Sequence, residues 1–281
     1  MARLSGKRMV ITGSSRSLGR EFALACGKEG ASLIINGTNE TALAEVESEL
    51  KRNGVPVHAV PGSVAENAVC QALVDTCVEA FGGIDVMVNN AGIVRDRTLL
   101  KMSDEDFDEV IAVDLRGPFL CTRNAARVMR EQESGHIVQI TSGSGLVGNF
   151  GQTNYAAAKA GLIGMMYTAV KELEKYGIRS NAMWPIARTD MTQGLIDKAG
   201  KSATELGFGE ASDVAEGLVW LASDGANHLN GQCLTFNGRK AALWRSPTEE
   251  YIRIDDQPMS AGDLADYFAQ LEPIPIYSSR R

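Results

Sequence analysis

The chain has 281 residues, 44% hydrophobic and 22% charged, which is typical of a globular protein with a large buried core. Its formal net charge of -7 is spread along the chain and not blocked, so we expect no nucleic-acid partner. No apolar run approaches the roughly 20 residues that a membrane-spanning helix needs, so we expect no membrane partner either.

Cysteine and histidine usage points to no metal. The five cysteines form no CxxC pair and the three histidines are scattered, so no group of ligands has the spacing of a metal site. No long apolar signal segment precedes the first strand. A reducing, cytoplasmic location fits this usage best.

In chain order, short apolar runs alternate with longer amphipathic stretches. We expect helices over 20–28, 41–53, 67–81 and 103–131. The expected strands are RMVIT, SLIIN, VPVHAV, IDVMVN, HIVQIT, IRSNAMW and QCLTF. Such alternation predicts a parallel sheet covered by helices on both faces. The sequence therefore predicts one doubly wound α/β domain of the Rossmann type over residues 1–243, with a seven-stranded parallel sheet.

Residues 244–281 are expected to form a C-terminal extension. Ser260 has the sequence context of a helix start, and Leu264, Phe268 and Leu271 follow as an apolar stripe. This pattern predicts a helix that covers a surface of its own domain or of a neighbouring subunit.

The stretch VITGSSRSLGREFALA combines a strand, a tight turn with Gly13 and Gly19, and the start of a helix. Glycines let a backbone approach a pyrophosphate closely, and a helix N-terminus stabilises its charge. The position after the first strand predicts a dinucleotide site.

The second strand distinguishes NADP(H) from NAD(H). It ends with Asn36, Gly37 and Thr38 and carries no acid that would bind a ribose 2′-hydroxyl. Arg16, in the glycine turn, offers a guanidinium suited to a 2′-phosphate. The alternative is that Arg16 is a solvated loop residue. The pattern favours NADP(H).

NYAAAKAGLIGMM sets Tyr155 and Lys159 one helical turn apart, and Ser142 ends the preceding strand. A free phenol has a pKa of about 10, and a neighbouring ammonium favours its ionised form. Such a tyrosine can exchange a proton with an alcohol or ketone, and a serine hydroxyl can hold the reacting oxygen.

Together the T-G-x-x-x-x-x-G turn, NNAG (89–92) and the Ser…Tyr-x-x-x-Lys set resemble the short-chain dehydrogenase/reductase family over roughly residues 5–240. The resemblance implies Ser142, Tyr155, Lys159 and Asp114 as the catalytic set. It implies cofactor contacts by Gly13, Ser15, Arg16, Ser17, Leu18, Gly19, Asn36, Thr38, Ser63, Val64, Asn90, Ala91, Gly92, Tyr155, Lys159, Pro185 and Thr189.

Three positions depart from the family pattern. Ser17 replaces the middle glycine of the turn, and Ser63 stands where relatives often have an aspartate that touches adenine. Asp114, in VDLRGPF, replaces an asparagine that supports a water chain to the lysine. The aspartate could hold that water, or it could pair with Lys159 and change the pH profile.

A finer resemblance concerns the substrate. RDRTLLKMSDEDFDEVIAVDLRGPF, GNFGQTNYAAAKAGLIG and PIARTDMT are similar to the (R)-3-hydroxyacyl-CoA dehydrogenase unit of the peroxisomal multifunctional β-oxidation enzyme and to bacterial 3-oxoacyl-thioester reductases. This implies a small-molecule ketone or alcohol substrate, a 3-oxoacyl or 3-hydroxyacyl thioester with coenzyme A as handle. Arg95, Arg97 and Arg116 either meet its phosphates or are solvated surface residues.

Two alternatives stay open: a ketoreductase for a steroid or other bulky hydrophobic alcohol, and a retired enzyme that binds NADP as a sensor. The segment after the sixth strand, rich in glycine, is expected to form a mobile lid. The resemblance also implies a homotetramer or homodimer. Ala156, Ala157, Ala160, Gly161 and Gly164 permit close helix packing, between subunits or inside one.

Overall fold

A computed structural model describes residues 2–247 and 259–270. Its one sheet has the strand order β3-β2-β1-β4-β5-β6-β7-β8. The strands are β1 (Arg8–Ile11), β2 (Ser32–Gly37), β3 (Val57–Pro61), β4 (Val86–Asn89), β5 (Gly135–Ile140), β6 (Ile178–Pro185), β7 (Cys233–Phe236) and β8 (Ala241–Trp244).

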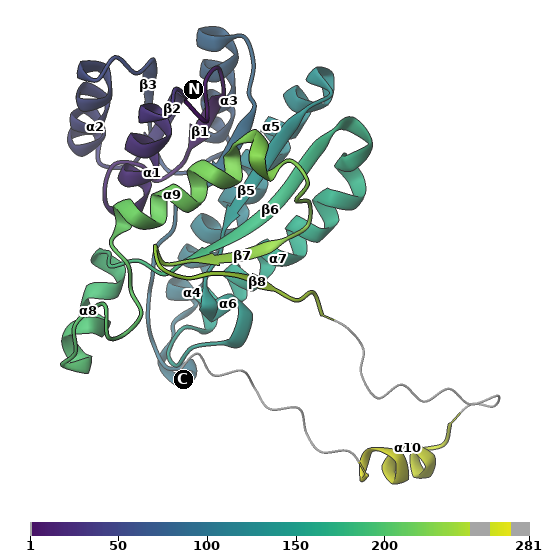
Figure 1. Cartoon of the computed structure of the whole chain (residues 1–281). Helices are drawn as coiled ribbons and strands as arrows, with labels where there is room; N and C mark the ends of the chain where they lie inside the picture. The colour runs from purple at the N-terminus through teal and green to yellow at the C-terminus, as the bar shows by residue number, and fades with distance from the viewer. Residues whose placement is uncertain (1, 248–258, 271–281) are drawn as a thin grey trace. The chain divides into compact units, whose positions relative to one another are not determined.

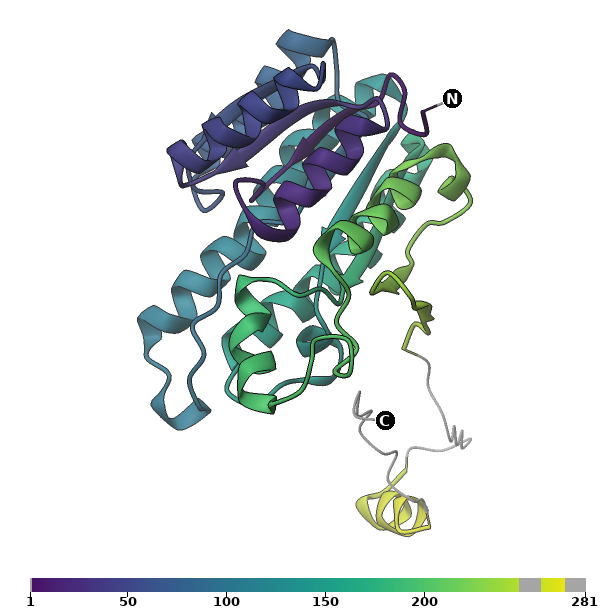
Figure 2. The same cartoon turned by 60° about the vertical axis from the view of Figure 1, so that its left-hand side comes forward.

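Helices cover both faces of this sheet, as Figures 1 and 2 show. The α-helices are α1 (Ser17–Lys28), α2 (Glu40–Arg52), α3 (Asn67–Phe81), α4 (Asp104–Ile111), α5 (Gly117–Gln132), α6 (Gly143–Val147), α7 (Thr153–Leu173), α8 (Asp190–Ala199), α9 (Ala211–Ala222) and α10 (Ala261–Phe268). Short 3-10 turns span Leu99–Lys101, Glu174–Tyr176 and Asp224–Ala226, and a π-helical segment spans Ala112–Arg116. Helices α1, α2 and α9 lie on one face, and α3, α5 and α7 on the other.

The predicted doubly wound domain is confirmed, and all seven expected strands are present and parallel to their neighbours. The strand number was wrong by one, because β8 pairs antiparallel with β7. Asn237 reverses the chain between them: its side chain accepts from the N–H groups of Arg239 and Lys240. Gly238 takes the left-handed φ of 83° that such a turn needs.

The expected helix over 103–131 is also divided. It forms α4, then the π-helical segment, then α5, so that one extra residue bulges between two helices. Such bulges frequently mark functional sites. Here the bulge holds Asp114, whose side chain is buried.

Two apolar layers hold the sheet between the helices. Successive residues of a strand point to opposite faces, so Met9 and Ile11 pack with Phe22 of α1, while Val10 packs with Leu73 of α3. These strand residues are fully buried. A sheet covered on both faces explains why the strands are apolar throughout and do not alternate with polar residues.

Residues after the sheet form a separate unit. The chain divides into two compact units, Met1–Trp244 and Arg245–Arg281. Within the second unit, the expected helix start at Ser260 is present, and Ser260 and Asp263 cap α10 reciprocally. Leu271, the last residue of the expected apolar stripe, lies outside the described residues.

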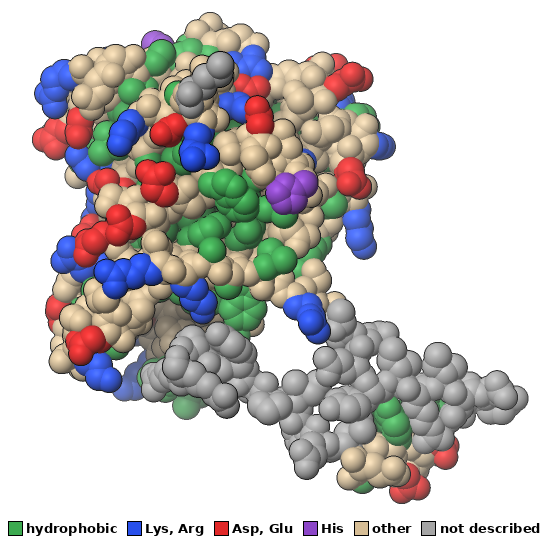
Figure 3. All heavy atoms as spheres, viewed as in Figure 1, with side chains coloured by type: hydrophobic (Ala, Val, Ile, Leu, Met, Phe, Trp, Pro, Cys, Tyr) green, Lys and Arg blue, Asp and Glu red, His purple; other side chains and the backbone are tan. Residues whose placement is uncertain are grey.

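Charged side chains of both signs are interspersed on the face of the main unit seen in Figure 3, around an apolar area at its centre. Among the described residues, no helix is long and apolar enough to cross a membrane.

The topology brings particular loops together. Strands β1 and β4 are neighbours, and their connections leave toward opposite sides of the sheet. In doubly wound folds this switch point opens a crevice at the carboxyl ends of the strands, where ligands bind. The glycine turn follows β1, NNAG ends β4, and Ser142 follows β5, so all three belong to this edge.

His136 in β5 is buried, and its Nε2 atom lies 3.0 Å from the Asn181 amide nitrogen. Because the amide donates, Nε2 accepts and Nδ1 carries the hydrogen, for which no partner is found among the described residues. Burial, together with the charges of Arg179 and Lys7, holds the pKa of His136 well below its ordinary value.

We therefore expect His136 to make folding sensitive to mild acid. As pH falls below the unfolded pKa of about 6.5, the unfolded chain takes up a proton that the folded chain resists. From about pH 7.5 to about pH 5.5 this costs about 1.4 kcal/mol of unfolding free energy. Urea unfolding at both pH values, for wild type and His136→Gln, checks it: the variant should lose less stability, and equal losses would contradict the prediction.

Candidate active site

The glycine turn lies against the end of β4. Gly13 has a left-handed φ of 65°, and a Cβ atom there would lie 2.7 Å from Ala91 Cα. A Cβ on Gly19 would collide with Gly13 O and come within 2.5 Å of Asn90 Nδ2. Both glycines are therefore required by close packing of the turn on NNAG.

Hydrogen bonds fix the same contact. Asn90 Nδ2 donates to the carbonyl oxygens of Thr12 and Gly13, at 2.9 and 3.1 Å. Thr12 Oγ1 accepts from the N–H groups of Asn90 and Ala91, both at 3.0 Å. Arg16, the residue before α1, makes no side-chain cap bond, so the cap residue does not occupy the first N–H groups of α1. These features fit a dinucleotide pyrophosphate.

Ser17 takes a left-handed φ of 49°, which non-glycine residues rarely adopt. It stands where the family pattern has its middle glycine, which explains why glycine suits this position. Leu18 follows in α1 and packs against the core.

At the end of β2, Asn36 is committed to structure. It is buried, and its Nδ2 atom donates to Val60 O and Gly62 O, both at 3.0 Å. A Cβ on Gly37 would lie 2.7 Å from Ser15 Oγ, so the glycine turn packs directly on this strand end. Thr38 is exposed beside it. The side-chain oxygen of Asn36 accepts from the Gly13 N–H at 3.4 Å, so Asn36 also supports the glycine turn.

Arg16 is the exposed cation of this region, with 78% of its side chain accessible. Its Nη1 atom lies 4.0 Å from a carboxylate oxygen of Asp190, which opens α8 and is itself 71% accessible. Such an exposed ion pair contributes little stability, so the guanidinium is readily released to another anion.

The loop after β3 is arranged around its own backbone. Ser63 Oγ accepts from the Ala65 N–H at 3.2 Å. Val64 is buried, and a Cβ on Gly117 would come within 2.7 Å of it, so Val64 anchors the loop on the start of α5.

The structure brings Ser142, Tyr155 and Lys159 together. Ser142 caps α6, and its Oγ accepts from the Ser144 N–H at 3.2 Å. Tyr155 and Lys159 share a face of α7, with Nζ 5.4 Å from the centre of the phenol ring. Burial raises the pKa of the Tyr155 phenol, and the side-chain hydrogen bond from Ser142 acts against this rise.

Close packing of α6 on α7 holds this group. A Cβ on Gly145 would lie 2.5 Å from the backbone of Lys159, and Thr141 Oγ1 donates to Lys159 O at 2.9 Å. Beneath Ser142, a Cβ on Gly143 would lie 2.5 Å from the ring of Trp184. The small residues Gly143 and Gly145 therefore determine how closely the segment that carries Ser142 packs on the sheet and on α7.

Asp114 pairs with Lys159, one of the two alternatives open from the sequence. Its Oδ2 lies 3.2 Å from Lys159 Nζ, and the two side chains are 0% and 3% accessible. The other oxygen, Oδ1, accepts from the Ile93 N–H at 2.8 Å. A Cβ on Gly92 would lie 2.7 Å from Oδ2 and 3.3 Å from Nζ. The last residue of NNAG must be glycine for this ion pair to form.

Burial and the neighbouring charges shift the pKa values of Lys159, Asp114 and Tyr155. Burial lowers the pKa of Lys159, but Asp114 and Tyr155 together more than offset this, and the net pKa is raised. Burial raises the pKa of Asp114, and Lys159 offsets only part of that. Burial also raises the pKa of Tyr155 above its ordinary value. Lys159 acts against this rise and Asp114 adds to it.

Pro185 ends β6 and Thr189 precedes α8. The Thr189 N–H donates to Thr192 Oγ1 at 2.8 Å, and the two hydroxyls lie 3.2 Å apart. This capping box makes the expected lid begin as a helix. Ile196 of α8 is buried, so one side of the lid is seated on the protein.

The arginines considered for thioester phosphates each have a partner in the protein, although the side chains of Arg95 and Arg97 are 41% and 58% accessible. Arg95 makes two bonds of 2.8 Å to the Glu109 carboxylate. Arg97 lies 3.8 Å from Asp106, and Arg116 donates to Ala65 O at 2.6 Å. Their first role is to fix the loop before α4 and the start of α5.

Sequence reasoning missed a polar hub beside Tyr155. Gln152 is buried; it accepts from Ser144 Oγ and Asn149 Nδ2, at 2.7 and 2.9 Å, and donates to Asp96. Asn154, fully buried, donates to Arg95 O and Asp106 O. The available signal was two amides just before Tyr155 in the sequence, Gln152 at the N-cap of α7 and Asn154 in its first turn. They tie the loops around Tyr155 to one another.

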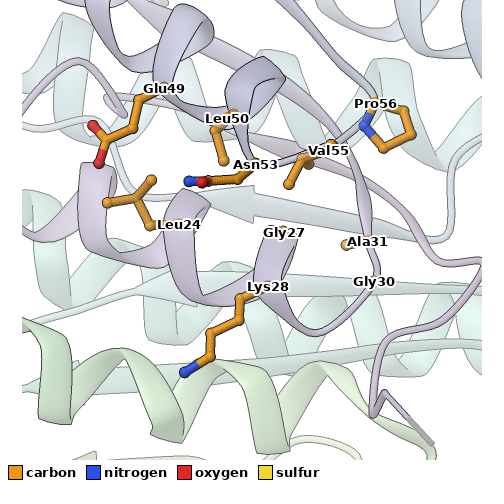
Figure 4. A pocket seen from close by; sticks show the side chains of 11 residues that line it. Leu24, Gly27, Lys28, Gly30, Ala31, Glu49, Leu50, Asn53, Val55 and Pro56 are labelled. Atoms are coloured by element: carbon orange, nitrogen blue, oxygen red, sulfur yellow. The ribbon is translucent and has the colours of Figure 1, made fainter.

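The pocket in Figure 4 lies toward the amino ends of β2 and β3, on the opposite side of the sheet from the strand ends that form the candidate active site. Leu24 and Lys28 of α1, Glu49 and Asn53 at the end of α2, and Val55 line a hollow of about 520 Å³. These segments precede β2 and β3, whereas the catalytic residues follow the ends of β4 and β5. Glu49 already pairs with Arg20 at 2.6 Å. This hollow has no part in the site described above.

A doubly wound sheet with a phosphate cradle and a Ser–Tyr–Lys group at its switch point defines a dinucleotide-dependent oxidoreductase. The chain belongs to the short-chain dehydrogenase family, whose sequence profile, described as "short chain dehydrogenase", matches residues 7–200. It is an NAD(P)-dependent oxidoreductase that acts on CH–OH groups.

Three relatives are informative. The 3-oxoacyl-[acyl-carrier-protein] reductase FabG of Staphylococcus aureus is 40% identical, with 83% of this chain and 97% of that protein covered. Hydroxyacyl-CoA dehydrogenase ChsB1 of Mycobacterium tuberculosis is 36% identical, covering 98% and 93%. A crystal structure of a short chain dehydrogenase from Mycobacterium avium superposes with a TM-score of 0.85 at 32% identity, covering 99% and 100%. The two mycobacterial matches thus extend over residues 245–281.

We expect Ser17→Gly to stabilise the protein by about 0.5–1 kcal/mol, because glycine adopts the left-handed conformation without the Cβ penalty. Ser15→Gly is the matched control, since Ser15 does not have a positive φ and gains nothing from glycine. Urea unfolding of both variants measures the difference. A loss of stability in Ser17→Gly would show that the Ser17 side chain supports the turn.

Proposed function

We propose that the protein is an NADP(H)-dependent oxidoreductase that interconverts 3-oxoacyl and 3-hydroxyacyl thioesters. The observation that carries the proposal is the grouping of Ser142, Tyr155 and Lys159 beside a glycine cradle at one edge of the sheet. The known relatives act on thioesters by name, as an acyl-carrier-protein reductase and a hydroxyacyl-CoA dehydrogenase.

The roles follow from the chemistry of each side chain. Ser142 holds the carbonyl oxygen of the substrate, and Tyr155 donates a proton to that oxygen. Lys159 lies beside the phenol and, as in the family, would anchor the nicotinamide ribose. When bound, the reduced nicotinamide supplies the hydride to the carbonyl carbon. In the reverse direction the Tyr155 phenolate accepts the hydroxyl proton.

The cofactor preference rests on charge. No carboxylate ends β2, and the first acid beyond it, Glu40, opens α2. Arg16 is exposed and held only by a long contact with Asp190. Backbone N–H groups of α1 and the glycine turn would hold the pyrophosphate, with Arg16 and Thr38 at the 2′-phosphate. Gly13 and Gly19 keep the cradle open for it.

The C-terminal residues favour coenzyme A over a carrier protein as the handle. The relative named as a carrier-protein reductase matches 83% of the chain, whereas the hydroxyacyl-CoA dehydrogenase matches 98%. Residues 245–281 therefore go with the coenzyme A branch. We propose that this extension covers its own domain or a neighbouring subunit.

Assembly into a homodimer or homotetramer is part of the proposal. On α7, Ala157, Ala160 and Gly164 lie exposed along one face, as a helix–helix contact between subunits would require. Gly161 faces inward, because a Cβ there would lie 2.7 Å from Leu115. The cytoplasmic location stays a prediction.

Tyr155→Phe should abolish proton donation and leave the fold intact. We expect acetoacetyl-CoA reduction with NADPH to fall by about 10²–10⁴-fold in kcat. NADPH binding, followed by fluorescence, serves as the control and should persist. Activity that survives in Tyr155→Phe would refute Tyr155 as the acid. If wild type binds NADPH but reduces only bulky cyclic ketones, the ketoreductase alternative holds, and binding without any turnover would favour the sensor.

Arg16→Ala should weaken NADPH selectively. A charge-assisted hydrogen bond contributes about 1.5–3 kcal/mol, so we expect KM for NADPH to rise about tenfold or more, with KM for NADH unchanged. Arg52→Ala, which removes an exposed arginine at the end of α2, is the matched control. Equal losses for both cofactors would contradict a role at the 2′-phosphate.

A further inference from the structure

We infer that Asp114 is a positioning residue that keeps Tyr155 in its protonated, proton-donating form by cancelling the charge of Lys159. This inference rests on the proposed function, because it concerns the proton that Tyr155 delivers. It assigns a consequence to the aspartate that stands in the place of the family's asparagine.

The ion pair is built into the fold. Asp114 Oδ2 and Lys159 Nζ are 3.2 Å apart, and neither side chain is more than 3% accessible. Among the described residues, Oδ2 has no other hydrogen-bond partner, and Oδ1 is fixed by the Ile93 N–H. Within the described part of the chain, Oδ2 of Asp114 therefore interacts with the Lys159 ammonium and with no other polar group. Because the pair is shielded from water, solvent weakens the attraction between the two charges very little. The negative charge of Asp114 therefore cancels most of the field that Lys159 exerts on its neighbours.

The charges that face Tyr155 are few. Lys159 contributes one positive charge from the same helix, Asp114 one negative charge from the π-helical segment, and Asp96 a second negative charge from the loop after β4. Ser142, before α6, contributes a neutral hydrogen bond. An asparagine at 114 would leave the ammonium uncompensated beside the phenol. The aspartate thus removes the main stabilisation that a phenolate would have.

The direction of the pKa shifts agrees with this geometry. Burial is the largest cause that raises the pKa of Tyr155; the charges of Asp114 and Asp96 raise it further, and Lys159 and Ser142 act against them. The resting group therefore holds a phenol. In carbonyl reduction, the Tyr155 O–H bond breaks as its proton goes to the carbonyl oxygen, while the carbonyl carbon receives the hydride. The phenolate that is left regains a proton from solvent.

The first test uses the protein without cofactor or substrate, so it does not depend on the proposed function. The phenolate of Tyr155 is followed by ultraviolet difference absorbance as pH rises, with a Tyr155→Phe protein subtracted in each background. Asp114→Asn should lower the pKa of Tyr155 by at least one pH unit. Asp114→Ser, a second neutral variant, gives the same comparison if Asp114→Asn does not fold. An unchanged or higher pKa in the folded variants would overturn the inference.

The second test follows acetoacetyl-CoA reduction against pH. In wild type, the rate should hold to higher pH than in Asp114→Asn, whose decline should begin at least one pH unit lower. Asp96→Asn is the matched control: its carboxylate is exposed, so its shift should have the same sign and be smaller. Equal shifts in both variants would show that any lost negative charge suffices, and the specific role of the buried pair would be rejected. A profile that only falls in height would assign Asp114 a structural role.

Discussion

A buried ammonium constrains this active site more than any other group. Lys159 is enclosed on α7, and a buried charge is costly unless a partner and good geometry compensate it. The partner, Asp114, comes from a π-helical bulge, and the space for both comes from Gly92. The Ile93 N–H then fixes the second oxygen. One ion pair thus ties the end of β4, the helix pair around the bulge and α7 to a single geometry.

The end of β4 has two functions that meet within four residues. Asn90 and Ala91 hold the glycine turn, and Gly92 makes room for Asp114 and Lys159. The cofactor cradle and the catalytic group therefore have a common foundation. A shift of NNAG would therefore move two parts of the site at once: the glycine turn that would hold the pyrophosphate, and Lys159 beside the Tyr155 phenol. In the proposed function, this shared support would keep hydride and proton delivery in a fixed relation, as an oriented two-centre reaction requires.

Local patterns in the sequence predicted most of this architecture. Seven strands followed from apolar runs and the Tyr155–Lys159 pair from helical spacing, which depend on near neighbours, whereas the family resemblance implied that Ser142 joins them. The eighth strand, β8, was missed because it has only four residues and forms no long apolar run. The Asn237-Gly238 pair before it is nevertheless a hairpin signal in the sequence. The left-handed φ of Ser17 could not be read from a serine.

Pairs that join distant segments were beyond the same reasoning. The sequence left Asp114 with two roles, water or Lys159, because the choice depends on how α7 packs on the π-helical bulge. The sequence left Arg95 and Arg97 either as phosphate contacts or as solvated surface residues, and in the structure they pair with Glu109 and Asp106 of α4. Their partners lie in the following helix, α4, and the path of the loop before α4 decides which charged side chains meet. Such contacts come from tertiary packing, which spacing alone does not encode.

Two charged residues of the candidate site, Arg16 and Asp114, act under different physical conditions. Arg16 is 78% accessible, so dissolved ions screen its attraction for an anion. Asp114 is fully buried, and its effect on Lys159 and Tyr155 is nearly independent of salt. Ionic strength should therefore alter the preference between the two nicotinamide cofactors and leave the protonation of the catalytic group untouched. In the proposed function, the exposed Arg16 would determine which cofactor is bound, and the buried Asp114 would determine the form in which Tyr155 meets the substrate.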